Sequence, residues 1–290
     1  MITEAELRRL AARWGVDPMV ADLDYGLGWF LAAMYAVQQP GGILWFKGGT
    51  CLRKCYLADY RFSEDLDFTA TDYLSPDVMM ARIERAQRWT SDQDGPDFAA
   101  VPPRLEVIED EYGSESFQAR VYYRGPLRWG GPPRAIRLDV TRAELMAWPG
   151  VQRPLNHPYS DVHAIGDVRP GCYTLREILA EKLRAVCGQR QFAIARDVYD
   201  IHQLVQSGAT PADVVSGLSA KCAARGVAIS AVTVDQLQKR HTQFEEDWRR
   251  RLSYLVRDIS AVSFDTAWQT VIETVALVQI ALSKQDSSAP

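Results

Sequence analysis

The 290-residue sequence has no apolar run long enough to cross a membrane, and it contains little cysteine and histidine. The longest apolar stretch near its start, residues 29–37, is less than half the roughly 20 residues that a spanning helix needs. No secretory signal is visible, so we expect a cytoplasmic protein with no membrane partner. Five cysteines, an odd number, fit a reducing compartment. Cys51 and Cys55 lie four residues apart, but no second pair of ligands at zinc spacing accompanies them, so we interpret them as small buried residues.

The sequence also lacks an excess of positive charge. Its net charge is -4 and its pI is about 5.7, so a nucleic-acid partner would have to be held by a local basic patch. Apolar residues make up 47% and charged residues 24%, as in ordinary globular proteins. The length exceeds that of a usual single domain. We expect a first domain at 1–148, a mainly helical lobe at 149–285 and a disordered tail at 286–290.

The most informative segment begins with a short apolar run at 43–46, which predicts a buried strand. Gly48, Gly49 and Thr50 follow, and the apolar spacing after them predicts a helix. Glycines let the backbone approach a ligand closely, and the first N–H groups of a helix attract anions. This turn therefore predicts a phosphate-binding site.

A second motif follows at residues 65–68, where aspartate alternates with an apolar residue. This is the period of a half-buried strand, so Asp65 and Asp67 should point to the same side. Two carboxylates held together repel each other, and a bound cation explains why they stay together. Hard oxygen ligands suit Mg²⁺.

The order of these motifs resembles the nucleotidyltransferase superfamily of DNA polymerase β. In that superfamily a glycine pair at a helix start and a D-x-D strand are followed by a third carboxylate on a later strand. Asp139, in the alternating segment 135–140, matches it. The resemblance implies an α+β (α/β) fold: a polymerase-β-like core with a mixed sheet, and a C-terminal helical bundle.

Helix signals and strand patterns elsewhere agree with that expectation. Capping residues predict helices after Thr3, Asp17 and Ser75. Residues 88–103 read as a loop, and 149–172 as an irregular crossing between the lobes. Further strands are expected at 105–108, 117–123 and 135–140, and further helices at 174–189, 196–206, 211–226, 233–256 and 264–283.

A second group of charged residues lies in the expected helical lobe. Lys182 falls within an apolar helical stripe, where its stem could follow the core edge to water or its ammonium could meet a triphosphate. Arg196, Asp197 and Asp200 lie within about one helical turn. Arg196 and Asp200 could simply form a surface pair. The residues alone leave these alternatives open.

Across nearly the whole chain, the segments KGGT, RFSEDLDF, LDVT and E-K-L-R-A followed by R-D-x-x-D resemble the AbiEii/MenT nucleotidyltransferase toxins of type IV toxin–antitoxin systems. The resemblance implies two Mg²⁺ ions and NTP as substrate. The metal carboxylates it implies are Asp65, Asp67 and Asp139, with Lys54, Lys182 and Asp200 as further catalytic positions. The nucleotide-binding positions it implies are Gly48, Gly49, Thr50, Ser63, Lys182 and Asp197.

The same resemblance implies transfer of nucleotides from an NTP to RNA, in particular the 3′ end of tRNA, which blocks translation, and it implies a cognate antitoxin. One alternative is a nucleotidyltransferase acting on a small molecule such as an antibiotic. Another is a non-catalytic RNA- or antitoxin-binding protein, which the presence of all three carboxylates disfavours. RNA is favoured by the basic residues of the helical lobe: Arg184, Arg190, Arg225, Lys239, Arg240 and Arg249 to Arg251.

Overall fold

The structure is a computed structural model that describes residues 1–37, 42–109, 115–128, 130–142, 144–190, 192–252, 254–256 and 261–288. The chain divides into two compact units. Unit 1 comprises Met1–Glu144 and Gly150–Tyr173, and unit 2 comprises Leu145–Pro149 and Thr174–Pro290.

Unit 1 is built on a mixed sheet, which confirms the expected α+β class. Its strands pair in the order β3-β4-β5-β2-β1-β7-β6 over the described residues. The pairs β2–β5 and β1–β7 are parallel, and the other pairs are antiparallel. The strands are β1 (Leu44–Lys47), β2 (Asp65–Ala70), β3 (Arg104–Glu109), β4 (Glu115–Tyr123), β5 (Arg134–Thr141), β6 (Val151–Gln152) and β7 (Gly171–Cys172).

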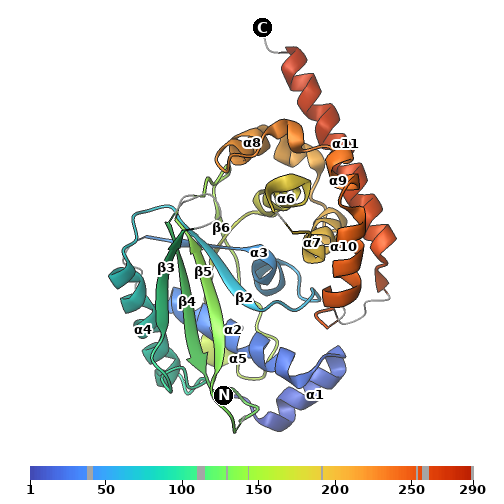
Figure 1. Cartoon of the computed structure of the whole chain (residues 1–290). Helices are drawn as coiled ribbons and strands as arrows, with labels where there is room; N and C mark the ends of the chain where they lie inside the picture. Colours follow the sequence, from blue (N-terminus) through green and yellow to red (C-terminus); the bar gives the residue numbers. More distant parts are fainter. Residues whose placement is uncertain are drawn as a thin grey trace. The chain divides into compact units, whose positions relative to one another are not determined.

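Helices of unit 1 begin where capping residues predicted them. The side chains of Thr3, Asp17 and Ser75 each accept a backbone hydrogen bond at a helix start. Helices α2 and α4 pack against each other on one face of the sheet (Figure 1). The expected loop from residue 88 begins later, because α4 continues to Asp92. The helices are α1 (Glu4–Trp14), α2 (Pro18–Ala36), α3 (Gly48–Cys51) continuing as the π-helix η1 (Leu52–Tyr56), α4 (Pro76–Asp92) and α5 (Val162–Ile165).

The segment at 150–173 differs from the expected crossing between lobes. It contributes β6 and β7 to the sheet, and Cys172 in β7 pairs in parallel with Phe46 in β1. The division of the chain therefore does not follow the expected boundary at residue 149. Strands of two residues carry no alternation that a sequence pattern could reveal, and the prolines of this segment resemble those of a linker.

Unit 2 is helical. In Figure 1, α6 lies among the other helices of its unit, and α7, α8 and η2 contact it. One long helix was expected at 233–256, but the structure divides it into α9, α10 and η4. The expected disordered tail is helical as far as Ser288, and residues 289–290 lie outside the described part. The helices are α6 (Leu175–Arg184) continuing as η2 (Ala185–Gln189), α7 (Ala195–Gln206), α8 (Pro211–Ala223), η3 (Ile229–Ala231), α9 (Val234–Gln238), α10 (His241–Asp247), η4 (Trp248–Leu252) and α11 (Phe264–Ser288).

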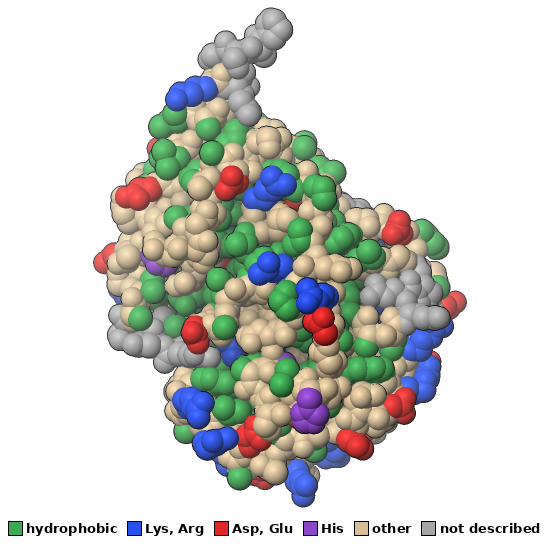
Figure 2. Space-filling model, turned by 180° about the vertical axis from the view of Figure 1, so that it is seen from behind, with side chains coloured by type: hydrophobic (Ala, Val, Ile, Leu, Met, Phe, Trp, Pro, Cys, Tyr) green, Lys and Arg blue, Asp and Glu red, His purple; other side chains and the backbone are tan. Residues whose placement is uncertain are grey.

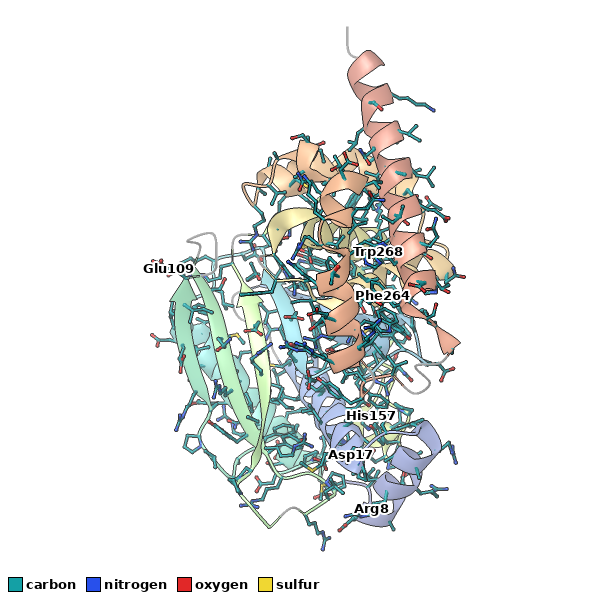
Figure 3. All side chains as sticks on the ribbon, turned by 45° about the vertical axis from the view of Figure 1, so that its right-hand side comes forward. Arg8, Asp17, Glu109, His157, Phe264 and Trp268 are labelled. Atoms are coloured by element: carbon teal, nitrogen blue, oxygen red, sulfur yellow. The ribbon has the colours of Figure 1, made fainter. Side chains whose placement is uncertain are left out.

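Aromatic packing holds the start of α11 against α10 and η4. Phe264 and Trp268 stack with their ring centroids 5.6 Å apart (Figure 3). Trp248 and Phe244 pack against these two rings at 5.6 and 5.7 Å. Aromatic pairs at such distances contribute about 0.5–1.5 kcal/mol each beyond area burial. This cluster explains why η4 and α11 meet although they are separated in sequence.

The surface is mixed in character. On the face shown in Figure 2, positively and negatively charged side chains lie among hydrophobic ones. Over the described residues, no helix has the length and apolar character needed to span a membrane.

Candidate active site

Three carboxylates converge on neighbouring strands of unit 1. Strands β2 and β5 run parallel with Asp67 opposite Asp139, and Asp65 lies two residues before Asp67 on the same face. One carboxylate oxygen from each of the three residues lies within 4.8 Å of the others. Leu66 and Phe68 point the other way and are fully buried, which fixes the register of β2. The structure therefore brings together the three acids expected from the sequence; we call them the acid cluster.

One cation bound to the acid cluster is Arg137. Its guanidinium lies 2.8 Å from Asp65 Oδ2 and 2.9 Å from Asp139 Oδ2, while half of its side chain remains exposed. Burial would lower the pKa of Arg137, but the nearby carboxylates, Asp139 first, outweigh burial and raise it. Sequence reasoning did not select Arg137, although its position two residues before Asp139 places it on the same strand face.

A second neighbour of the cluster, Gln118, could not be found from the sequence. Its Nε2 donates a hydrogen bond of 2.9 Å to Asp139 Oδ1. Gln118 lies opposite Asp139 because β4 and β5 pair in that register. An amide hydrogen bond of this kind orients the carboxylate and leaves its other oxygen for a different partner.

The glycine turn lies directly beside the acid cluster. Gly48 begins α3 with a φ of 76°, and a Cβ there would lie 2.5 Å from Asp67 Oδ2. Any other residue would be strained and would push against the carboxylate. A Cβ on Gly49 would collide with the guanidinium of Arg61, a buried residue that sequence reasoning did not select. At Gly48 the backbone thus approaches Asp67 more closely than a residue with a side chain would allow.

Thr50, which was expected to bind nucleotide phosphates, makes a structural contact through its hydroxyl. Its side chain is fully buried, and its hydroxyl donates to the backbone carbonyl of Asp65 at 2.5 Å. The hydroxyl therefore ties α3 to β2. No side chain caps the start of α3, so the backbone N–H groups of this turn are the groups suited to an anion.

The acid cluster has the ligand set of a divalent-cation site. Three carboxylates from two rigid strands offer hard oxygen donors, which Mg²⁺ prefers over the nitrogen and sulfur ligands of zinc. The carboxylates are only partly buried, so a hydrated ion can reach them. These residues could hold a divalent metal.

Lys54 is not brought to the acid cluster. It is fully buried in unit 1, and its ammonium binds Asp24 Oδ2 at 2.8 Å. Arg53 binds the other oxygen of Asp24 at 2.6 Å, and Tyr159 donates to Oδ2 at 2.8 Å. Burial lowers the pKa of Lys54 despite the neighbouring carboxylate. The expected catalytic role of Lys54 has no support in these contacts, which join η1 to α2.

Ser63 lies two residues before Asp65, in the segment that leads into β2. Its side chain is buried. The expectation that it binds nucleotide rests on the family pattern, because the geometry shows only that Ser63 is close in sequence to the acid cluster.

Lys182, Asp197 and Asp200 form a cluster of their own in unit 2. The Lys182 ammonium lies 2.6 Å from Asp197 Oδ1 and 2.8 Å from Asp200 Oδ2. Arg190 approaches Asp197 Oδ2 at 3.5 Å. Both carboxylates are buried, so Asp200 is not a surface residue. The Lys182 side chain does not follow the core edge to water. Its ammonium is bound by two carboxylates that lie three residues apart on α7. We call this group the lysine cluster.

The electrostatics of the lysine cluster follow from burial. Burial alone would raise the pKa of Asp197, but the charges of Arg190 and Lys182 outweigh it and hold the pKa below its usual value. Asp197 therefore stays ionised at neutral pH. The cluster is a buried ion network whose charges depend on one another.

Comparison with known proteins decides the family. The family model described as nucleotidyl transferase AbiEii toxin, type IV TA system, matches residues 29–270, a range that includes both clusters. The chain belongs to this family. It is therefore a nucleotidyltransferase toxin, an enzyme that uses a nucleotide substrate and has an antitoxin as partner. The family predicted from the sequence motifs is confirmed.

Two solved structures share the fold of this chain. MenT4, a nucleotidyltransferase toxin from Mycobacterium tuberculosis H37Rv, superposes with a TM-score of 0.66 at 22% identity, covering 96% of this chain and 90% of that chain. JHP933 from Helicobacter pylori superposes with a TM-score of 0.55 at 16% identity, covering 94% and 97%. At these identities the likeness shows the fold alone. No curated protein sequence matches the chain.

Proposed function

We propose that the chain transfers nucleotides from an NTP to the 3′ end of an RNA, in particular tRNA, and so blocks translation. The close approach of Gly48 to Asp67 is the observation that supports NTP binding. A turn suited to phosphates and a group of acids suited to a cation lie side by side in unit 1. A metal-bound triphosphate needs this combination.

Each residue of the site has a separate task in the proposal. Asp65, Asp67 and Asp139 would hold Mg²⁺, which when bound supplies charge neutralisation at the reacting phosphate and the leaving pyrophosphate. The backbone N–H groups from Gly48 onward would receive phosphate oxygens. Gln118 keeps the Asp139 carboxylate oriented. Arg137, half exposed, would turn from the carboxylates to the phosphates when the cation replaces it.

A role for the lysine cluster of unit 2 in the reaction is proposed because of the family resemblance. Lys182 would help to neutralise phosphate charge, with Asp197 and Asp200 holding its ammonium in place. A lysine fixed between two carboxylates cannot reorient freely, so positioning is the role that its contacts favour. Its test is the pair of stability and rate measurements described in the Discussion.

The RNA acceptor rests on the family and on the basic residues of unit 2, and the structure weakens one part of that argument. Arg249, Arg250 and Arg251 are exposed, but each has an acidic partner four residues earlier in the chain. Arg251 lies 3.3 Å from Asp247, and Arg250 lies 3.9 Å from Glu246. These pairs reduce the field that the run would present to RNA.

The experiment measures incorporation of each of the four labelled NTPs into purified tRNA and into total RNA with Mg²⁺, across a salt series. We expect labelling at the 3′ end that falls steeply with salt, because RNA contacts release counterions. Replacing Arg249, Arg250 and Arg251 by alanine should reduce the log–log slope by about 0.7–0.9 for each lost phosphate contact. An unchanged slope would place the RNA elsewhere on the protein.

The same experiment separates the alternative acceptors. Transfer to a small cationic acceptor such as an aminoglycoside, with no labelling of any RNA, would replace the RNA proposal by the small-molecule one. No consumption of NTP with any acceptor would favour a binding protein. We place the reaction in the cytoplasm, where NTP and tRNA are both available.

A further inference from the structure

Three of the five cysteines meet in the core of unit 1. Cys51 ends α3, Cys55 lies in η1 and Cys172 lies in β7. Their sulfur atoms all lie within 4.8 Å of one another, and all three thiols are free and buried. The group is separate from the acid cluster, and the proposed reaction does not use it. We call it the cysteine cluster.

The fold explains why these three residues converge. Cys51 and Cys55 are four residues apart in a continuous helical segment, so their side chains share one face. Strand β7 lies parallel to β1, with Cys172 opposite Phe46, and β1 leads directly into α3. The third sulfur thus comes from a segment over 100 residues later in the chain. A search for paired cysteines in the sequence does not detect such a site.

The spacing of the sulfurs fits a metal ion. A thiolate–metal bond is about 2.3 Å long, so three sulfurs around one ion in a plane lie about 4 Å apart. The separations within the cysteine cluster allow that arrangement. Among the residues that the structure describes, no histidine, cysteine or carboxylate joins the group as a fourth ligand. Structural zinc sites need four ligands, whereas Cu(I) is a soft ion that thiolates select.

A positive charge lies beside the cysteine cluster. Arg153 donates from Nε to the Cys55 carbonyl at 3.3 Å. A complex of thiolates carries negative charge, which a neighbouring guanidinium compensates. The thiol of Cys172 donates to the Pro170 carbonyl at 3.4 Å, so metal binding would have to displace its proton.

We propose that Cys51, Cys55 and Cys172 bind one soft metal ion, with Cu(I) the best match. The ion would join the helix that begins at the glycine turn to strand β7. Because Cys51 directly follows Thr50 in α3, the bound ion would hold this short helix against the sheet. The proposal concerns this site alone and stands whether or not the acceptor of the transfer reaction is RNA.

The test uses the full-length protein, reduced and kept free of oxygen, in a Cu(I) titration against the chelator bathocuproine disulfonate. We expect one tightly bound equivalent and a higher melting temperature. Cys55→Ser should weaken binding by more than about 100-fold, beyond what the loss of an outer-shell contact costs. The control is Cys222→Ser, which alters a buried free cysteine of unit 2 and should leave binding unchanged.

X-ray absorption of the copper-loaded wild-type protein provides a second readout that needs no variant. We expect three sulfur neighbours at about 2.3 Å or slightly less. Equal Cu(I) affinity in the Cys55→Ser and Cys222→Ser proteins, or a copper shell of nitrogen and oxygen, would overturn the proposal. The three cysteines would then be small packing residues of the core. If Cys55→Ser does not fold, the absorption spectrum of the wild type decides.

Discussion

The acid cluster of unit 1 and the lysine cluster of unit 2 both combine carboxylates with a cation, and they differ in exposure. In the acid cluster, 29% of the Asp139 side chain and 49% of the Arg137 side chain are exposed. In the lysine cluster, the exposed fractions are 12% for Lys182 and zero for Asp200. The first cluster is open to solvent, whereas the second is enclosed by packed helices.

This difference separates two uses of the same chemical groups. An exposed ion pair is worth little, so a divalent cation can replace Arg137 at small cost. A buried ion network is hard to open, because removing one partner leaves an uncompensated charge in the protein interior. We therefore expect substitutions in the acid cluster to act on ligand binding and rate, and those in the lysine cluster to act first on stability.

The largest effect is expected from Asp67→Asn. Loss of a carboxylate that holds the cation removes several kcal/mol of charge stabilisation, so nucleotide transfer should fall at least about 1000-fold. The melting temperature should stay the same or rise, because one of three repelling charges is removed. The measurement is the initial rate of label transfer from NTP, with the exposed Glu84→Gln as control. Transfer at the wild-type rate in Asp67→Asn would refute the assignment of the acid cluster.

The next largest effect is expected from Lys182→Ala. It leaves Asp197 and Asp200 buried without their ammonium, which should lower the free energy of unfolding by about 3–5 kcal/mol. Urea unfolding measures this change, and the exposed Lys239→Ala serves as control. Adding Asp200→Asn to Lys182→Ala should recover part of the loss.

Rates on folded Lys182→Ala protein then separate two roles. If transfer falls only as far as the folded fraction falls, the lysine is structural. A kcat that drops while the NTP KM and the folded fraction change little would assign Lys182 a direct part in the reaction.

Acid should weaken the lysine cluster in a defined pH window. The pKa of Asp197 is held below its unfolded value of 3.8 by Arg190 and Lys182, against burial. The unfolded chain therefore binds the proton first, so this stability is fully present above pH 3.8 and is lost as pH falls through the lower folded value. Unfolding free energies from about pH 5 to about pH 2 should fall less steeply in Asp197→Asn than in wild type. Equal slopes in Asp197→Asn, wild type and the exposed Glu273→Gln would contradict this cause.

The smallest effect is expected from Arg137→Ala. Removing the half-exposed cation leaves Asp65 and Asp139 free for a metal, and an exposed pair is worth at most about 1 kcal/mol. Affinity for Mn²⁺, a spectroscopic substitute for Mg²⁺, should therefore rise by up to about 5-fold in a paramagnetic resonance titration. The exposed Arg88→Ala should leave it unchanged. Weaker Mn²⁺ binding in Arg137→Ala would mean that the arginine supports the ion and does not compete with it.

Local patterns in the sequence predicted much of the fold. Helix starts followed from Thr3, Asp17 and Ser75, whose side chains cap within three residues. The period of two at 65–68 placed Asp65 and Asp67 on one face, and the glycine turn before them gave the start of α3. These features depend on contacts a few residues apart, so a single segment contains the information. Motif order was sufficient to indicate the family.

The short strands and the divided helix were missed because tertiary packing determines them. Strand β7 exists because it pairs with β1, and nothing in its two residues indicates a strand. The helix expected at 233–256 is interrupted at residues 239–240 and contains a π turn. In both places a contact with a distant segment is present: β7 pairs with β1, and Arg240 at the interruption donates from its guanidinium to the Val186 carbonyl at 3.3 Å.

The sequence by itself determined the list of chemical groups, and the tertiary structure decided which of them meet. Asp139 reaches Asp67 through the register of β2 with β5, and Arg137 arrives with it. Lys54 and Lys182 were both candidate site residues in the sequence, yet Lys54 pairs with Asp24 in the core. Cys172 lies beside Cys51 and Cys55, for which the sequence indicated no further ligand. These contacts are made by residues about 15 to 120 positions apart in the sequence. Only the packing of the sheet and the helices fixes the distances between their side chains.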